Sequence, residues 1–486
     1  MLRELGESMS YLDGLGKLEE SQRLEFKEAS SGLPDDLWES YSAFANTEGG
    51  TIVLGVAEDR GTGDFYPVGV SDARALVSDF WSVIRNQKRV ERDVMLYDGV
   101  RVEREGDAEL IVIYVPRAER GDKPVRVYDR RRKAFVAWVR RGSGDYEASG
   151  SDLRQMAYDC EPRADRQALE EFGVNSLCSD TVRRYRAIFA ERKPRSPWVA
   201  DSDEDFLYHV GALAKGRDGL VHPTRAGLLA FGFEYEITNL LPQFLLDYRE
   251  EVSPDLRWDD RVVSQEGDWS GNLIDFYLTV TGRFLSRFKS PFRTDGTGTR
   301  HGSSNPVTEA VNEALTNALV HAYYGGTTAV TVVLRPDRLE LTNPGTLLVD
   351  ADVAIVGGTS ETRNPTIMRL FSFIGAGDRA GSGLQEIWGT WSATFDAEPK
   401  LSESHSPSSV KLVLPLVDER RPPSPSVEDV FSAVEGAPEG LTSKDVQALF
   451  GVSERVAQNR LRELLSLDRG VERVREGRSL RYRIAP

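Results

Sequence analysis

The sequence predicts a multidomain protein of mixed α/β and α+β class. The chain has 486 residues, more than one ordinary hydrophobic core accommodates, so roughly two to four domains are expected. Short apolar runs typical of buried strands alternate with segments of helical periodicity. A polar, proline-rich stretch from Arg420 to Ser426 has the composition of an interdomain linker. These three observations carry the prediction.

Composition and charge disfavour several classes of protein. The net charge of −16 disfavours wholesale coating of nucleic acid, but residues 441–486 hold ten Lys/Arg against six Asp/Glu. The two cysteines, Cys160 and Cys178, are too few for a disulfide framework or a zinc cluster. The sequence has no run of eighteen apolar residues and no apolar signal core at its N-terminus. We therefore expect a cytoplasmic protein without a membrane span.

Residues 18–150 are predicted to form one α/β domain. Apolar periodicity and glycine punctuation indicate helices and strands in this order: a helix from Leu37 to Asn46, a buried strand from Gly50 to Val56, a helix from Ala73 to Lys88, and strands from Leu110 to Val115 and from Ala134 to Arg140. Asn46-Thr47-Glu48-Gly49-Gly50 is typical of a helix end before a buried strand.

Two strings in this domain are specific. Glu20 to Lys27 reads ESQRLEFK, and Ala43 to Thr51 reads AFANTEGGT. Together with Lys123-Pro124-Val125 and Val139 to Ser143, they resemble the Schlafen-type AlbA-like domain. The resemblance implies nucleic-acid binding, and Phe135 and Trp138 among arginines suit base stacking and phosphate contact. The alternative is that these aromatics belong to the core.

Some Schlafen members are nucleases that use three carboxylates. The resemblance places the first two at Glu20 and Glu25, and the third at Glu58 or Asp59. Such a triad holds Mg²⁺ or Mn²⁺ and activates water for attack on a phosphodiester. In the alternative interpretation Glu25 and Lys27 are structural.

A second site is predicted on a helix near residue 313. Glu313, Asn317 and His321 recur at intervals of four residues and share one helix face. An apolar stripe runs beside them, formed by Val311, Ala314, Leu315, Ala318 and Ala322. A carboxylate there can take a proton from water, and the neighbouring amide oxygen can bind Mg²⁺.

A glycine turn follows at Gly381-Ser382-Gly383, before a predicted helix, and can present backbone N–H groups to phosphates. With the helix, it resembles the GHKL ATPases, whose Bergerat fold is an α/β sandwich. The resemblance implies that Glu313 is the catalytic glutamate, that Asn317 binds Mg²⁺, and that Gly381 and Gly383 contact ATP.

The first glycine box of that family departs from its pattern here. Asn343-Pro344-Gly345 stands where the family has an Asp that contacts adenine, so weak or altered nucleotide selectivity is expected. The order of NPG, GTSETRNP and GSGL resembles bacterial regulators with a RecG-like C-terminal ATPase domain. Residues 300–418 are assigned to this domain. Residues 151–299 are a connecting α+β region or part of the same ATPase unit.

Residues 427–486 resemble a winged helix-turn-helix domain. Leu441 to Phe450 is predicted as a helix capped by Thr442 or Ser443, and Glu454 to Leu465 as a second helix after a tight turn. Val471 to Arg475 and Ser479 to Ile484 form the wing. The candidate DNA contacts are Arg455, Gln458, Asn459 and Arg462 on the second helix and Arg478 and Arg481 on the wing. The alternative is a protein-contact module.

The favoured function is an ATP-responsive DNA-binding protein, a transcriptional regulator whose partner is duplex DNA. Because GHKL domains commonly dimerise when ATP binds, the resemblance also implies a homodimer or higher homo-oligomer. The main alternative is an ATP-gated, metal-dependent nuclease, such as an anti-phage defence effector. A scaffold with degenerate sites is the third class.

Overall fold

The computed structural model describes residues 20–59, 61–288, 305–358, 361–377, 381–395, 397–416, 426–450, 454–467, 469–476 and 479–485. The chain divides into two compact units. The first comprises residues 1–334, 340–387 and 400–413, and the second residues 335–339, 388–399 and 414–486. Among the described residues, no helix is both long and apolar enough to cross a lipid bilayer.

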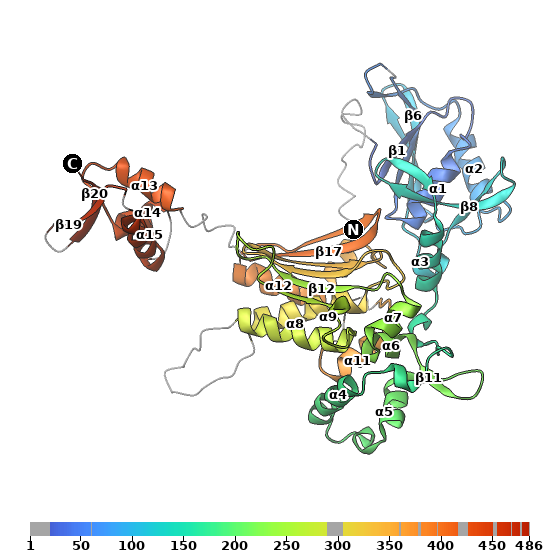
Figure 1. Cartoon of the computed structure of the whole chain (residues 1–486). Helices are drawn as coiled ribbons and strands as arrows, with labels where there is room; N and C mark the ends of the chain where they lie inside the picture. Colours follow the sequence, from blue (N-terminus) through green and yellow to red (C-terminus); the bar gives the residue numbers. More distant parts are fainter. Residues whose placement is uncertain are drawn as a thin grey trace. The chain divides into compact units, whose positions relative to one another are not determined.

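The N-terminal part of the first unit is built on a four-stranded sheet of order β1-β2-β6-β5 (Figure 1). Its strands are β1 (Leu24–Lys27), β2 (Gly50–Leu54), β5 (Val100–Glu105) and β6 (Ala108–Val115). Ile52 and Leu54 join helices α1 (Leu37–Asn46) and α2 (Ala73–Ile84) in one core. Val53 faces a second cluster with Phe26, because successive side chains of a strand point to opposite faces.

The predicted helices and strands of this region are confirmed, and two of them end earlier than predicted. The strand predicted from Gly50 to Val56 ends at Leu54, because Gly55 has a φ of +96° and leads into β3 (Val56–Glu58), which pairs with β4 (Phe65–Pro67). Helix α2 ends at Ile84 instead of Lys88. A second sheet of order β7-β8-β9 comprises β7 (Arg126–Asp129), β8 (Ala134–Arg141) and β9 (Gly144–Glu147).

Helix α3 (Gly150–Cys160) follows this sheet and begins with a capping box between Ser149 and Asp152. The region after it is largely helical. It contains α4 (Ser179–Arg192), α5 (Asp203–Val210), β10 (Leu213–Lys215), β11 (Val221–Pro223), α6 (Arg225–Phe231) and α7 (Glu234–Leu240). Helix α6 is apolar along most of its length, and its residues from Ala226 to Phe231 are buried.

A six-stranded sheet of order β13-β12-β14-β15-β17-β16 follows. Its strands are β12 (Leu246–Glu250), β13 (Asp260–Val263), β14 (Val330–Leu334), β15 (Arg338–Pro344), β16 (Lys400–His405) and β17 (Ser408–Pro415). The associated helices are α8 (Leu273–Arg287), α9 (Pro306–Val320), α10 (Ala351–Val356), α11 (Pro365–Phe373) and α12 (Gly383–Phe395). In Figure 1, α8 and α9 run beneath the strands. Two of the six strands therefore come from residues before 300.

The C-terminal sixty residues contain α13 (Val427–Glu435), α14 (Ser443–Phe450), α15 (Glu454–Ser466) and a sheet of order β18-β20-β19. The strands are β18 (Leu441–Thr442), β19 (Val471–Glu476) and β20 (Ser479–Ile484). The helix predicted from Leu441 begins at Ser443, because Leu441 and Thr442 pair with β20 instead. The Thr442 hydroxyl accepts a hydrogen bond from the Asp445 N–H at 3.2 Å, so Thr442 caps the helix.

Candidate functional site

Helix α9 presents the three polar residues predicted on its surface. Asn305 caps its N-terminus by accepting the Val307 N–H at 3.1 Å, and Pro306 occupies the first turn. The predicted apolar stripe is buried throughout; its members are Val311, Ala314, Leu315, Ala318 and Ala322. Glu313 and Asn317 stay partly exposed, and His321 ends the helix as its C-cap. The stripe anchors the helix, and the polar face borders a cavity.

That cavity contains about 1050 Å³ of open space and is bordered by residues far apart in sequence. It brings together Glu313 and Asn317 of α9, Asn343 of β15, and Gly381 and Gly383 at the start of α12. Its apolar lining includes Leu341, Met368, Leu401, Val410 and Leu412. A largely apolar cavity with a few polar groups is the usual form of a small-molecule site.

Two glycines shape this cavity in different ways. A Cβ at Gly383 would lie 2.2 Å from Oε1 of Glu313, so the glycine leaves room for that carboxylate. Gly345 has a φ of +98°, and a Cβ there would lie 2.9 Å from Nη1 of Arg363. Gly345 is absent from the cavity lining, so its role is to turn the chain after β15. Asn343 is buried, and its amide donates to the Pro344 carbonyl at 3.4 Å.

Two titratable residues of the cavity, His321 and Glu313, have defined surroundings. Withdrawal from water, together with the nearby Arg363 guanidinium, lowers the pKa of His321 to about 4. His321 is therefore neutral near pH 7 and does not repel a cation at Asn317. Glu313 has interactions within the protein, and its carboxylate lies against Gly383.

Arg363 is a cavity residue that sequence analysis did not single out. Its side chain is almost completely buried, and it donates to the carbonyls of His321 at 2.5 Å and Thr346 at 2.7 Å. It also forms a two-point ion pair with Asp159 of α3, at 2.6 Å and 3.0 Å. In the sequence, the Arg-Asn-Pro string before α11 could have drawn attention to Arg363. Nothing in that string indicates that Asp159 is its partner.

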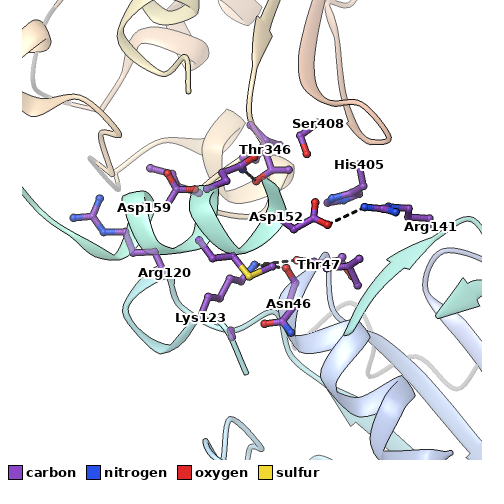
Figure 2. Close-up of a pocket in the computed structure, with 16 residues that line it drawn as sticks. Asn46, Thr47, Arg120, Lys123, Arg141, Asp152, Asp159, Thr346, His405 and Ser408 are labelled. Atoms are coloured by element: carbon purple, nitrogen blue, oxygen red, sulfur yellow. Dashed lines mark hydrogen bonds and ion pairs between the residues drawn. The ribbon is translucent and has the colours of Figure 1, made fainter. Parts of the chain in front are cut away.

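A second cavity of about 570 Å³ adjoins the first (Figure 2). Thr346, Leu347 and Leu348 line both cavities. Lys123 lines the second one and donates to the carbonyls of Asn46 at 2.8 Å and Thr47 at 3.4 Å, at the end of α1. Removal from water and the charge of Arg117 lower the pKa of Lys123 to about 7.

Glu48, Glu403 and His405 form the single group in the described part of the chain whose three candidate metal-ligand atoms lie within 4.8 Å of one another. Arg23 pairs with Glu48 at 3.1 Å, and Arg117 pairs with Glu403 at 3.3 Å. Since two guanidinium groups already compensate both carboxylates, we interpret the group as an ion-pair network. His405 lowers the pKa of Glu48 to about 2 by a hydrogen bond at 3.2 Å.

The structure does not assemble the predicted nuclease triad. Glu25 is buried and paired with Lys27 and Arg140, each at 2.7 Å. Glu20 accepts a hydrogen bond from the Phe26 N–H at 3.1 Å. Burial is the main cause that raises the pKa of Glu20, and the negative charge of Glu25 raises it further. Asp59 and Glu58 are exposed, and Asp59 caps its own turn at Gly61. Among the described residues, none of these acids belongs to a group of three side chains whose metal-ligand atoms lie within 4.8 Å of one another. The ion pairs of Glu25 with Lys27 and Arg140 therefore agree with the alternative interpretation, in which Glu25 and Lys27 are structural.

An aromatic and basic surface lies on the small sheet β7-β8-β9. Phe135 is 39% exposed and meets Tyr128 edge-on, with ring centroids 5.6 Å apart. Lys88, Arg89 and Arg130 border the same depression. Trp138, in contrast, packs against the core formed by α1 and α2. Of the two aromatics considered for stacking, Phe135 is therefore the accessible one.

The predicted DNA-contacting face is described in part. Gln458, Asn459 and Arg462 are exposed on α15, and Arg462 donates to the Asn459 side chain at 3.2 Å. Arg481 donates a hydrogen bond to the Gly440 carbonyl at 2.8 Å, so one of its N–H groups is engaged within the domain. The side chain of Arg455 and residue Arg478 lie outside the described residues.

Three family models match successive parts of the chain. Residues 20–149 match "Schlafen, AlbA_2", residues 154–247 match "Domain of unknown function (DUF8451)", and residues 327–414 match "Putative ATP-dependent DNA helicase recG C-terminal". The last match begins after α9, so Glu313 and Asn317 lie outside it. No curated protein matches the chain.

Two solved structures are similar. The DIP2311 protein from Corynebacterium diphtheriae is 16% identical, with a TM-score of 0.40, over 99% of this chain and 97% of that one. The N-terminal domain of a "Putative ATP-dependent DNA Helicase RecG-related Protein" from Nitrosomonas europaea is 31% identical, with a TM-score of 0.23, over 28% of this chain and 88% of that one. On the family matches, this chain contains a Schlafen AlbA_2 domain followed by a domain of the recG C-terminal type.

Proposed function

We propose that this chain is an ATP-responsive nucleic-acid-binding protein that acts as a transcriptional regulator. The observation that carries the proposal is the first cavity, where Glu313, Asn317, Asn343, Gly381 and Gly383 meet. These residues come from three separate segments. The face of α9 and the glycine turn were predicted from local patterns, and Asn343 was assigned through the GHKL resemblance. Their convergence is unexpected if the helix and the glycine turn are only structural.

The chemistry of the lining suits a nucleoside triphosphate. The amide oxygen of Asn317 is a hard ligand suited to Mg²⁺, which would neutralise phosphate charge when bound. The backbone at Gly381 and Gly383, at the start of α12, can approach phosphates closely because neither residue has a side chain. Glu313 is placed on the same helix face to accept a proton from water. The apolar lining suits a purine ring.

Asn343 defines the base-recognition part of the proposal. An asparagine can accept a hydrogen bond from the adenine amino group and can also donate one, whereas an aspartate only accepts. The same side chain can therefore satisfy the O6 edge of guanine after an amide rotation. We expect the preference for ATP over GTP to be weaker than an aspartate would impose.

Nucleic-acid contact is proposed for two surfaces. The Phe135 surface has exposed aromatic area beside Lys88 and Arg130, the combination that binds single strands by stacking and charge. The last sixty residues are proposed as a winged helix that binds duplex DNA, supported by exposed Asn459 and Arg462 on α15 and by the two-stranded β19–β20 hairpin. A nucleotide-dependent homodimer, implied by the GHKL resemblance, is part of the same proposal.

The direct test is calorimetric titration of ATP with Mg²⁺ into the full chain. Asn317→Ala should abolish measurable binding, because a metal ligand is lost. Asn312→Ala is the matched control: Asn312 lies on the same helix but not in the cavity lining, and its variant should bind ATP as the parent does. Unchanged affinity in Asn317→Ala would refute the assignment. Absence of binding in the parent would leave the scaffold interpretation.

A further inference from the structure

The two cavities are separated by one short segment of chain. Thr346, Leu347 and Leu348 follow β15 and line both the candidate nucleotide cavity and the cavity of Figure 2. The first cavity lies against the six-stranded sheet. The second is bordered by the Schlafen domain and α3. A change in the position of this segment therefore alters both cavities at once.

From the nucleotide side, the segment is held by Arg363. The guanidinium donates to the Thr346 carbonyl at 2.7 Å and to the His321 carbonyl, at the end of the helix that carries Glu313 and Asn317. Arg363 lines the nucleotide cavity and is 4% exposed. Asp159 of α3 supplies the opposite charge through both carboxylate oxygens. A buried guanidinium depends on such a partner, so α3 and the cavity wall are tied together.

Helix α3, the Schlafen domain and strand β16 each contribute a further contact to the same segment. The Gln155 amide of α3 donates to the Thr346 hydroxyl at 2.8 Å. Arg117, just after β6, donates to the Leu347 carbonyl and pairs with Glu403. Glu403 in turn accepts the Leu347 N–H at 3.2 Å. Both backbone polar groups of Leu347 are thus engaged by side chains outside the segment.

The far side of the cavity is connected as well. Arg120 pairs with Glu361 at 3.2 Å and donates to the Thr362 carbonyl at 3.3 Å. Both Glu361 and Thr362 line the nucleotide cavity. The Schlafen domain therefore contacts two separate parts of the cavity wall, through Arg117 on one and Arg120 on the other.

We propose that Thr346–Leu348 and Arg363 form a coupling element through which the occupant of the nucleotide cavity controls α3 and the Schlafen domain. This rests on the proposed function, because the occupant is the nucleotide. Arg363 is a positioning residue: it fixes Thr346 and the end of α9 relative to α3. A ligand that touches this wall changes its position or mobility, and differential binding to the two arrangements is what couples two sites.

Linkage makes the coupling reciprocal. If nucleic acid on the Schlafen domain favours one arrangement of α3, it changes ATP affinity by the same factor by which ATP changes nucleic-acid affinity. Typical coupling factors are roughly 5–150-fold. Loss of the Gln155 or Asp159 contact should reduce that factor toward one while each ligand alone still binds.

The first measurement is hydrogen exchange of the full chain with and without ATP and Mg²⁺. In the parent protein, ATP should slow exchange in peptides from 341–348 and also in α3, residues 150–160. In Gln155→Ala and in Asp159→Asn, protection should remain around the cavity and be lost from α3. Arg154→Ala, an exposed change on α3, is the control and should behave as the parent does.

The second measurement is ATP affinity by calorimetry with and without saturating single-stranded DNA. The parent should show at least about a fivefold difference, and Gln155→Ala should show a much smaller one. Cavity protection without any change in α3 in the parent protein would overturn the coupling and leave ATP binding standing. No protection anywhere, with no ATP affinity, would overturn the proposed function and the coupling together. If Asp159→Asn does not fold, Gln155→Ala alone tests the coupling, because it removes only one hydrogen bond between neutral groups.

Discussion

The carboxylate of Glu313 occupies the space that a side chain at Gly383 would need: a Cβ there would lie 2.2 Å from Oε1. The two residues are on different helices, α9 and α12, and meet at the proposed phosphate end of the cavity. Glycine at this position therefore serves the placement of the proposed catalytic base as well as the approach of backbone to phosphate.

Gly383→Ala should displace Glu313 without unfolding the protein, because the end of a long side chain can rotate away. ATP binding should persist and ATP hydrolysis should fall by at least about tenfold, toward the level of Glu313→Gln. Gly389→Ala is the matched control, since a Cβ at Gly389 on the same helix meets nothing within 4 Å. Phosphate release at saturating ATP measures the effect. Parent-like hydrolysis in Gly383→Ala would contradict the role of Glu313.

Glu313→Gln should separate binding from hydrolysis. Glutamine keeps the shape of the side chain but cannot take a proton, so ATP affinity should stay within about threefold while turnover falls by roughly 100-fold or more. The measurement pairs calorimetry with phosphate release on one protein preparation. If both affinity and turnover are unchanged, Glu313 is not the base.

The Glu48–His405 pair should contribute to stability at neutral pH and lose that contribution in acid. The folded pKa of Glu48, about 2, lies below its ordinary value of 4.5, so the contribution is present above pH 4.5 and disappears as the pH falls toward 2. The whole shift would correspond to roughly 3 kcal/mol, at about 1.4 kcal/mol per pKa unit. The share of His405 is smaller, because Arg23 contributes to the shift and solvent screens this half-buried carboxylate.

Urea unfolding of Glu48→Gln at pH 7 and at pH 3 tests this contribution. The variant should be less stable than the parent at pH 7, and the difference should shrink at pH 3. His405→Gln should produce a smaller loss, because Glu48 keeps its ion pair with Arg23. The double variant should lose less than the sum of the two single losses, because the Glu48–His405 interaction is shared. Additive losses would show that Glu48 and His405 act independently.

Phe135→Ala should weaken binding of a single-stranded oligonucleotide by roughly 1–3 kcal/mol, the usual effect of losing one stacking aromatic. The fold should be unaffected, because Phe135 is exposed and its loss creates no cavity. Tyr146→Ala is the control, since Tyr146 is an exposed aromatic of β9 outside the Lys88–Arg130 depression. Fluorescence anisotropy compares the two variants. Equal affinities would remove Phe135 from the interface.

Removal of all residues after Val417 should weaken binding to duplex promoter DNA and lower the salt slope, because the basic terminal segment is lost. Asn459→Ala or Arg462→Ala should cost roughly 1–3 kcal/mol on the preferred site and less on other sequences. Arg481→Ala is less informative, since its guanidinium also holds the Gly440 carbonyl. Equal affinity and slope in the truncated protein would make protein contact the better interpretation of this segment.

Local patterns in the sequence determined the elements that carry the site. Helix α1 has the predicted bounds, because glycines end it and a buried strand follows. The apolar stripe of α9 determined which face is buried and therefore that Glu313 and Asn317 share the other face. Strands β19 and β20 were recognisable for the same reason: alternation and glycine punctuation depend on near neighbours in sequence.

The tertiary structure alone decided which of these patterns meet. Arg363 and Asp159 are 204 positions apart, and their ion pair follows from the packing of α3 beside the sheet, which leaves no periodic trace in sequence. The carboxylates of the proposed nuclease triad show the opposite case. Glu25 and Asp59 matched a pattern, but Arg140 and Lys27 neutralise one and a local turn holds the other in solvent. Side-chain pairing across long separations depends on strand order and helix packing, and only the folded chain specifies these.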